Sequence, residues 1–132
     1  MKFLLDTNIC VYIIKKHSSE IIHRFKTHRP EDLGISSITL AELEYGVAKS
    51  AHAQKNREAL EQFLVPIEIK PFDDRASEGY GLIRAGLERR GITIGPLDML
   101  IAAHAVSLNV TLVSHHLREF KRVSGLKIET WL

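Results

Sequence analysis

The chain begins with the stretch MKFLLDTN (Met1 to Asn8), in which a short apolar run ends abruptly at Asp6. Such a run is too short for a helix and predicts a buried β-strand. Thr7 and Asn8 are residue types that cap helices, and apolar residues then recur at the spacing of one helical face. The stretch therefore predicts a strand followed at once by a helix, with an acidic residue at the carboxyl end of the strand.

Similar units follow along the chain. Further short apolar strands are expected at residues 33–36, 67–69, 111–113 and 126–128. Helices are expected at 18–25, from Thr39, at 53–63, from Ala76 to the glycine at 91, at 97–108 and, as a short turn, at 117–122. Strands that alternate with helices predict an α/β fold with a parallel sheet covered on both faces. Folds of this kind place their sites beyond the carboxyl ends of the strands.

The composition narrows the class of protein. The length of 132 residues predicts a single domain over residues 1–132, and 45% hydrophobic against 26% charged residues excludes intrinsic disorder. The single cysteine, Cys10, cannot form an intrachain disulfide and favours a reducing compartment. No apolar run approaches the length of a membrane span or forms a signal peptide, so we expect a cytoplasmic protein. A net charge of +2 does not by itself indicate nucleic acid.

Four carboxylates are placed at the predicted edge. Asp6 follows the first strand, Glu42 lies in the helix after the second, Asp98 opens the most apolar helix and Glu119 follows the fourth strand. Grouped carboxylates raise one another's pKa unless a cation compensates them, and oxygen ligands select Mg²⁺ or Mn²⁺. Such an ion could activate a water for attack on a phosphodiester. These four residues are therefore the candidate catalytic residues.

Each of the four also has a purely structural interpretation. Asp6 could cap the first helix, and Glu42 could close a capping box with Thr39. Asp98 could be an acid favoured by the helix dipole in a first turn, and Glu119 could be a solvated surface residue. The functional interpretation rests on the placement of all four at the same edge.

Four segments of the chain resemble, in their order and spacing, PIN-domain ribonucleases of the VapC toxin type. They are LLDTN (4–8), SSITLAELEYG (36–46), IGPLDMLIAAHA (94–105) and VSHHLREFKRV (113–123). The resemblance implies a three-layer α/β/α sandwich with a central parallel sheet. It also implies a Mg²⁺- or Mn²⁺-dependent endoribonuclease that acts on RNA, with tRNA as a candidate substrate. Toxins of this type are held inactive by a cognate VapB-type antitoxin and usually form homodimers.

The resemblance assigns roles to particular residues. Asp6 matches the family's first metal-binding aspartate, Glu42 its glutamate and Asp98 its central aspartate, so that Asp6 and Asp98 are expected as metal ligands. Thr7 and Asn8 match the neighbours of the first aspartate, which would orient it or a water through hydrogen bonds.

The chain departs from the family pattern after the fourth strand. Many members have Asn-Asn or Asn-Asp there, whereas this chain has His115 and His116, which leaves Glu119 as the nearest carboxylate. A histidine at this position could bind Mn²⁺ better than Mg²⁺, could contact substrate phosphate together with Arg118, or could belong to a loop without a role.

Basic residues near the predicted edge are candidates for binding RNA phosphates: Arg84, Arg89, Arg90, Arg118, Lys121 and Arg122. Two other classes of function remain open from the residues. A phospho-acceptor signalling module also clusters acids around Mg²⁺, but it needs a lysine after a late strand. A non-catalytic PIN-like module would bind RNA or an antitoxin without cutting.

Overall fold

The computed structural model describes all 132 residues and contains a five-stranded sheet with the strand order β3-β2-β1-β4-β5. The strands are β1 (Phe3–Leu5), β2 (Leu33–Ser36), β3 (Glu68–Lys70), β4 (Thr111–Val113) and β5 (Lys127–Glu129). Every neighbouring pair is parallel. The first strand of the chain lies at the centre of the sheet, as expected when the earliest unit is extended in both directions by later ones.

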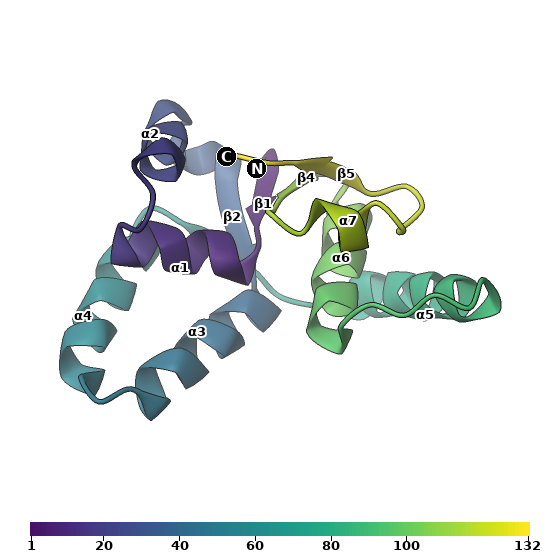
Figure 1. Cartoon of the computed structure of the whole chain (residues 1–132), viewed down its shortest axis with the longest axis horizontal. Helices are drawn as coiled ribbons and strands as arrows, with labels where there is room; N and C mark the ends of the chain where they lie inside the picture. The colour runs from purple at the N-terminus through teal and green to yellow at the C-terminus, as the bar shows by residue number, and fades with distance from the viewer.

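Helices cover both faces of this sheet, which confirms the predicted α/β/α sandwich (Figure 1). One face carries α1 (Thr7–Lys15), α2 (Ser19–Thr27), α3 (Ser37–Lys49) and α4 (Ala53–Leu64). The other face carries α5 (Asp74–Arg89), α6 (Pro96–Leu108) and the short α7 (Leu117–Phe120). A 3-10 turn, η1 (Pro30–Asp32), leads into β2.

The sheet divides the hydrophobic core into two halves. Adjacent strand residues point to opposite faces, so Leu5 and Val113 pack with α1, α3 and α4, whereas Leu4 and Leu112 pack with α5 and α6. All four side chains are fully buried. Burial on both faces explains why the strands appear in the sequence as continuous apolar runs and not as alternating ones.

The most apolar helix, α6, lies in the interior as its sequence predicts. Residues 101–105 are all buried, and α6 packs along α5. Within α6, His104 is 1% exposed, and its Nδ1 lies 2.8 Å from the hydroxyl of Ser36. None of the helices combines the length and the apolar character needed to cross a membrane.

The start of α1 differs from the sequence expectation. The side chain that caps this helix is Asp6, whose Oδ1 accepts a hydrogen bond of 2.9 Å from the backbone N–H of Ile9. Thr7 is already the first helical residue, so neither Thr7 nor Asn8 can serve as the cap. The carboxylate of Asp6 therefore has a structural role in addition to its place at the edge of the sheet.

The start of α3 also differs. The helix begins at Ser37, and the cap is Ser36, whose Oγ accepts a hydrogen bond of 3.0 Å from the N–H of Ile38. Thr39 is a buried residue inside the first turn, which places Glu42 in the second turn. The alternative in which Glu42 closes a capping box with Thr39 is therefore wrong, and Glu42 is available for other contacts.

One glycine is required by the close spacing of the strands. Gly34 lies in β2 between β1 and β3, and a Cβ there would lie 2.9 Å from the carbonyl oxygen of Glu68 and would overlap the Met1 side chain. We expect Gly34→Ala to lower the free energy of unfolding by about 2 kcal/mol, because the backbone must shift. A Cβ added to Gly46 in α3 would meet no atom within 4 Å, and Gly46→Ala should raise the free energy of unfolding by up to about 1 kcal/mol. Urea denaturation measures both changes, and equal effects of the two substitutions would contradict this explanation.

Candidate active site

The candidate site lies where the carboxyl ends of the strands meet the starts of three helices (Figure 1). Asp6 joins β1 to α1, Ser36 joins β2 to α3, and Ser114 follows β4 directly. Helix α6 returns from the same edge, so its first turn brings Asp98 there from a distant part of the sequence. The parallel topology thus collects polar residues from four separate segments.

Asp6 is the most deeply buried of the four acids, with only 3% of its surface exposed. Burial raises the pKa of its carboxyl, although hydrogen bonds from Ser114 and from the Ile9 N–H oppose this increase, as do His116 and His115 nearby. The charged form is therefore held in place by two donors while it remains poorly solvated. A bound cation stabilises such a poorly solvated carboxylate more than it stabilises an exposed one.

Asp98 is half-buried in the first turn of α6, after Pro96 at the first helical position. Its pKa is raised, first by burial and then by the negative charges of Asp6, Glu119 and Glu42, while His116 opposes the shift. The Asp98 carboxylate therefore lies within electrostatic range of all three other predicted acids. The structure brings the four residues to one edge.

Glu42 is held by a residue from another helix. The hydroxyl of Thr7 donates a hydrogen bond of 2.7 Å to Glu42 Oε1 and lies 3.3 Å from the hydroxyl of Thr39. This contact links the start of α1 to the second turn of α3. It fixes the orientation of the Glu42 carboxylate, whereas the sequence assigns Thr7 to the orientation of Asp6 or a water.

The two histidines after β4 occupy different surroundings. His115 packs against Tyr12, with ring centroids 5.1 Å apart, and both of its ring nitrogens are buried without a hydrogen-bond partner. His116 points toward the acids: its Nε2 lies 3.1 Å from the amide nitrogen of Asn8, and its Nδ1 lies 3.8 Å from Glu119 Oε2. Asn8 therefore contacts His116 and not Asp6.

Three of these side chains form a compact group. Asp98, His116 and Glu119 each offer a ligand atom, and these atoms all lie within 4.8 Å of one another. The side chains of His116 and Glu119 are 41% and 47% exposed, so the group is open to solvent. It joins α6 to the turn that begins α7.

Ser114 is a residue of this site that the sequence analysis missed. Its buried side chain hydrogen-bonds to Asp6 and accepts a hydrogen bond of 2.9 Å from the His116 N–H. It couples the turn after β4 to the acid after β1. Its position directly after a strand, like that of Asp6 itself, is the signal that could have identified it.

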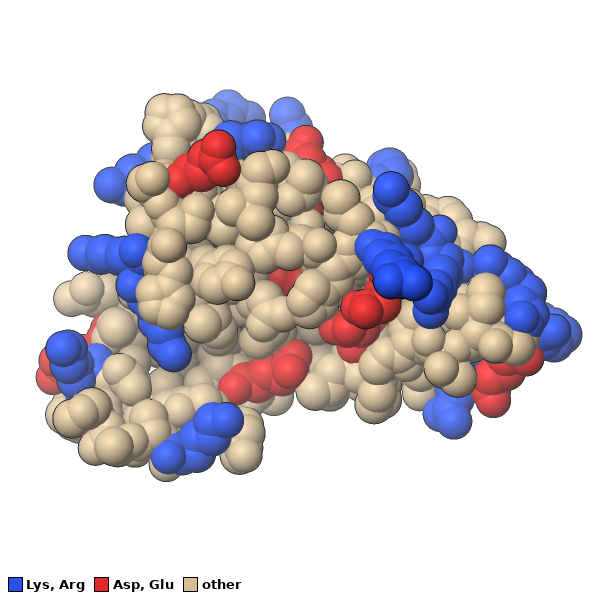
Figure 2. All heavy atoms as spheres, in the orientation of Figure 1, with Lys and Arg blue, Asp and Glu red and all other residues tan.

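No lysine or arginine forms an ion pair with any of the four acids. Figure 2 shows acidic side chains across the middle of this face and a group of basic side chains beside them over α7. Arg118 on α7 is exposed and has no hydrogen bond or ion pair, whereas Arg84 pairs with Glu88 on α5. The basic residues therefore border the acidic edge without neutralising it.

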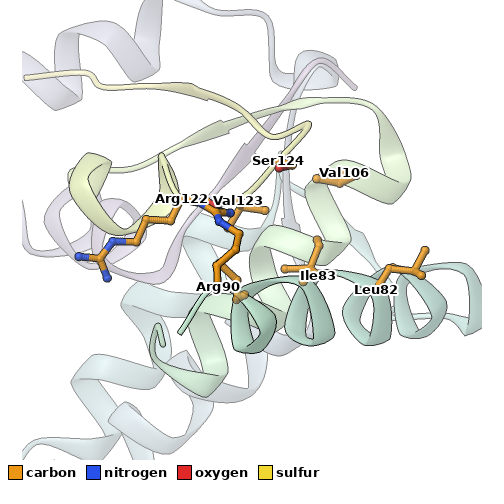
Figure 3. A pocket seen from close by; sticks show the side chains of 10 residues that line it. Leu82, Ile83, Arg90, Val106, Arg122, Val123 and Ser124 are labelled. Atoms are coloured by element: carbon orange, nitrogen blue, oxygen red, sulfur yellow. Dashed lines mark hydrogen bonds between the residues drawn. The ribbon is translucent and has the colours of Figure 1, made fainter. Parts of the chain in front are cut away.

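One cavity is separate from this edge. It measures about 320 Å³ and lies between α5 and residues 122–124, as Figure 3 shows. Five of its ten lining residues are hydrophobic, among them Leu82, Ile83 and Val106, and none is a carboxylate. Arg90 at its rim donates a hydrogen bond of 2.9 Å to the backbone carbonyl of Arg122. The cavity therefore supplies no group to the acidic site.

The residues after β4 argue against a phospho-acceptor signalling module. Such a module needs a lysine after a late strand, facing the acids. The residues that follow β4 are Ser114, His115 and His116, so the turn lacks that lysine. The site instead offers carboxylate oxygens and one imidazole around a half-buried centre, which is a donor set for a divalent cation.

Comparisons with known proteins agree with this description. The PIN domain family matches residues 3–126. The chain is 43% identical to ribonuclease VapC2 of Rickettsia felis over 132 aligned residues. This alignment covers 99% of this chain and 98% of that protein. It is 42% identical over 131 residues to the tRNA(fMet)-specific endonuclease VapC of Salmonella typhimurium, with 99% and 98% covered. A crystal structure of DNA-bound VapBC from Salmonella typhimurium superimposes with a TM-score of 0.95 at 42% identity, over 100% of this chain and 99% of that one.

Proposed function

Because this chain belongs to the PIN-domain family, among its VapC ribonucleases, we propose that its acidic edge holds Mg²⁺ or Mn²⁺ and cuts RNA internally. The observation that carries this proposal is the uncompensated negative charge around Asp98. Its half-buried carboxylate lies near three others, and no lysine or arginine pairs with them. A divalent cation resolves this repulsion, and the presence of all four acids favours catalysis over a non-catalytic binding module.

The donor set fits a hard cation. Asp6, Glu42, Asp98 and Glu119 provide carboxylate oxygens, which Mg²⁺ and Mn²⁺ prefer. Burial of Asp6 and partial burial of Asp98 strengthen their attraction for a cation because water screens them less. We assign Asp6 and Asp98 as the direct ligands, with Glu42 and Glu119 beside them.

A bound divalent cation would supply a water activated for attack and would offset the charge that develops on the scissile phosphate. The residues of this chain position the reactants. Thr7 occupies Oε1 of Glu42, which leaves Oε2 to accept a hydrogen bond from the attacking water. Arg118 on α7, with Lys121 and Arg122 directly after it, would bind flanking phosphates. Attack by water spares the ribose 2′-hydroxyl, so the products carry 5′-phosphate and 3′-hydroxyl ends.

The substrate and partners follow from the relatives. Since the Salmonella typhimurium relative is a tRNA(fMet)-specific endonuclease at 42% identity over the full chain, we assign a tRNA as the substrate. We also assign a cognate VapB-type antitoxin, because relatives of solved structure are VapBC complexes, together with a homodimeric state and a cytoplasmic location. Growth arrest on expression, relieved by a co-expressed antitoxin, tests this context, and normal growth at full expression would contradict it.

The proposed activity is tested with the purified chain and bulk tRNA. We expect discrete fragments with Mg²⁺ or Mn²⁺, none after addition of EDTA, and recovery when the cation is restored in excess. Fragments should accept ligation through a 5′-phosphate. Cleavage that continues in EDTA would contradict the proposal because it needs no metal. Products with 2′,3′-cyclic phosphates would contradict it because they indicate attack by the ribose 2′-hydroxyl.

A substitution at Thr7 tests how Glu42 is oriented. Thr7→Val keeps the shape of the side chain but removes the hydroxyl that donates to Glu42. We expect cleavage to fall by about 10- to 100-fold, the usual cost of losing a hydrogen bond that orients a metal-site carboxylate. Thr27→Val, which removes a hydroxyl bonded to the Arg24 carbonyl on α2, should leave the rate unchanged. Equal rates for Thr7→Val and the wild type would reject this role of Thr7.

A further inference from the structure

We propose that Asp98, His116 and Glu119 form a second cation subsite, in which the imidazole of His116 binds Mn²⁺ directly and gives this chain a preference for Mn²⁺ over Mg²⁺. The inference rests on the proposed metal-dependent function and adds a ligand to it. The sequence leaves open whether His116 binds Mn²⁺, contacts substrate phosphate or has no role, and the structure places its ring within the acidic group.

The three side chains are close enough to share one cation. The ligand atoms of the three residues lie within 4.8 Å of one another. Two atoms bound to one cation at about 2.1 Å lie no more than about 4.2 Å apart, on opposite sides of the ion. A small rotation of the two exposed side chains, His116 and Glu119, closes this difference, while Asp98 is fixed on the first turn of α6.

Hydrogen bonds hold the imidazole of His116 in place. The backbone N–H of His116 donates to Ser114, which fixes the turn, and Nε2 contacts the Asn8 amide at 3.1 Å. Nδ1 faces Glu119. If the Asn8 amide turns by 180°, its Oδ1 accepts a hydrogen bond from Nε2–H, and the lone pair of Nδ1 is then directed at the cation. Histidine ligands are commonly oriented in this way by an acceptor at the other nitrogen.

The ligand atoms of the three residues suit Mn²⁺ better than Mg²⁺. Mg²⁺ binds oxygen and keeps much of its water, whereas imidazole suits transition-metal ions. Mn²⁺ accepts both kinds of donor, so a subsite with two carboxylates and one imidazole favours it over Mg²⁺. Asp98 also lies near Asp6, which allows one carboxylate to serve both cation positions.

The direct test is pulsed EPR on the wild-type chain with MnCl₂. A nitrogen bonded to Mn²⁺ produces ¹⁴N modulation of the electron spin echo, and we expect this signal in the wild type. It should persist in His23→Phe, which replaces an exposed histidine on α2, and disappear in His116→Phe. Absence of the signal in the wild type would overturn the proposal without any need for a variant to fold. Persistence in His116→Phe would also overturn it.

Calorimetric titration with MnCl₂ and with MgCl₂ measures the selectivity. We expect His116→Phe to weaken Mn²⁺ binding by about tenfold and Mg²⁺ binding by less than about twofold, since only the nitrogen ligand is lost. Glu119→Gln should weaken both ions. Equal losses for both ions in His116→Phe would overturn the preference.

The outcomes separate this inference from the proposed function. If the wild type cuts tRNA and binds Mn²⁺ without the nitrogen signal, the proposed function stands and the His116 ligand is rejected. If it binds neither ion and cuts no RNA, both fail. The inference is supported only when the nitrogen signal and metal-dependent cleavage occur in the same protein.

Discussion

Replacement of Asp98 by asparagine is expected to lower the rate of tRNA cleavage by about a thousandfold or more. The amide keeps the shape of the side chain but removes the charge that binds the cation. Metal ions contribute several kcal/mol to transition-state stabilisation, and each 1.4 kcal/mol corresponds to a factor of ten in rate. Single-turnover cleavage of tRNA at saturating Mg²⁺ measures the loss.

The same substitution should stabilise the protein when no cation is present. The pKa of Asp98 is raised in the folded state, because of burial and the charges of Asp6, Glu119 and Glu42. The folded chain therefore binds a proton more tightly than the unfolded chain does, and stability falls as the pH rises through the folded pKa. Asp98→Asn removes this cost, so its free energy of unfolding in EDTA should exceed that of the wild type at pH 7. The difference should shrink as the pH falls toward the usual value of 3.8.

Two comparisons make the Asp98 result specific. Asp74→Asn alters another first-turn aspartate, exposed on α5, and should change neither cleavage nor the pH dependence. Lowered pKa values of His104 and His115 act in the opposite sense, but they act equally in the wild type and in Asp98→Asn, so the difference between the two proteins isolates Asp98. An Asp98→Asn variant that cuts tRNA at the wild-type rate would show that the helix-dipole interpretation was the correct one.

Two substitutions at Asp6 separate its structural role from its chemical role. Both Asp6→Asn and Asp6→Ala should reduce cleavage by about a thousandfold, because neither side chain binds a cation as a carboxylate does. Only Asp6→Ala removes the acceptor that caps α1, so only this variant should lose about 1 kcal/mol through the missing cap, whereas asparagine caps as well as aspartate does. Cleavage assays and urea denaturation on the same preparations measure the two effects.

The matched control for Asp6 is Asp73, which caps α5 through a hydrogen bond of 3.0 Å from the Ala76 N–H. Asp73→Ala should lose a similar free energy of unfolding with no change in cleavage. If Asp6→Asn retained activity, Asp6 would be a cap alone. If Asp73→Ala also abolished cleavage, loss of activity could not be attributed to the metal-binding carboxylate.

The sequence predicts the strands and helices well because the apolar runs are short and fully buried on both faces. Residues 33–36 and 111–113 agree with β2 and β4, and the other strands differ by one or two residues at their ends. Parallel topology then brings the residues that follow each strand to one edge. The convergence of Asp6, Glu42 and Glu119 could therefore be predicted from their positions after strands, and that of Asp98 from its place at the start of the helix that leads into β4.

The hydrogen-bond partners could not be predicted in the same way. Asp6, Thr7 and Asn8 all suit a helix cap, and only the three-dimensional structure shows that Asp6 takes this role while Thr7 donates to Glu42. Glu42 in turn follows two serines and a threonine, Ser36, Ser37 and Thr39, which all suit a cap at the start of α3. Competing local motifs of similar free energy are resolved by contacts between distant segments, which the sequence does not display.

His115 and His116 illustrate the same limit. The two residues are adjacent and chemically identical, yet one packs against Tyr12 and the other joins Asp98 and Glu119. The turn after β4 gives them different neighbours, and Ser114 fixes that turn through its bonds to Asp6 and to the His116 backbone. No pattern of residue types distinguishes the two histidines in advance.

The central claim is that Asp6 and Asp98 share a divalent cation. A crystal of the full chain soaked in MnCl₂ and measured near the manganese absorption edge tests it most directly. We predict an anomalous peak bonded to carboxylate oxygens of both residues, at the distance of about 2 Å typical of a hard cation. A crystal in which both carboxylates are ordered but point apart, with manganese bound to neither, would contradict the account.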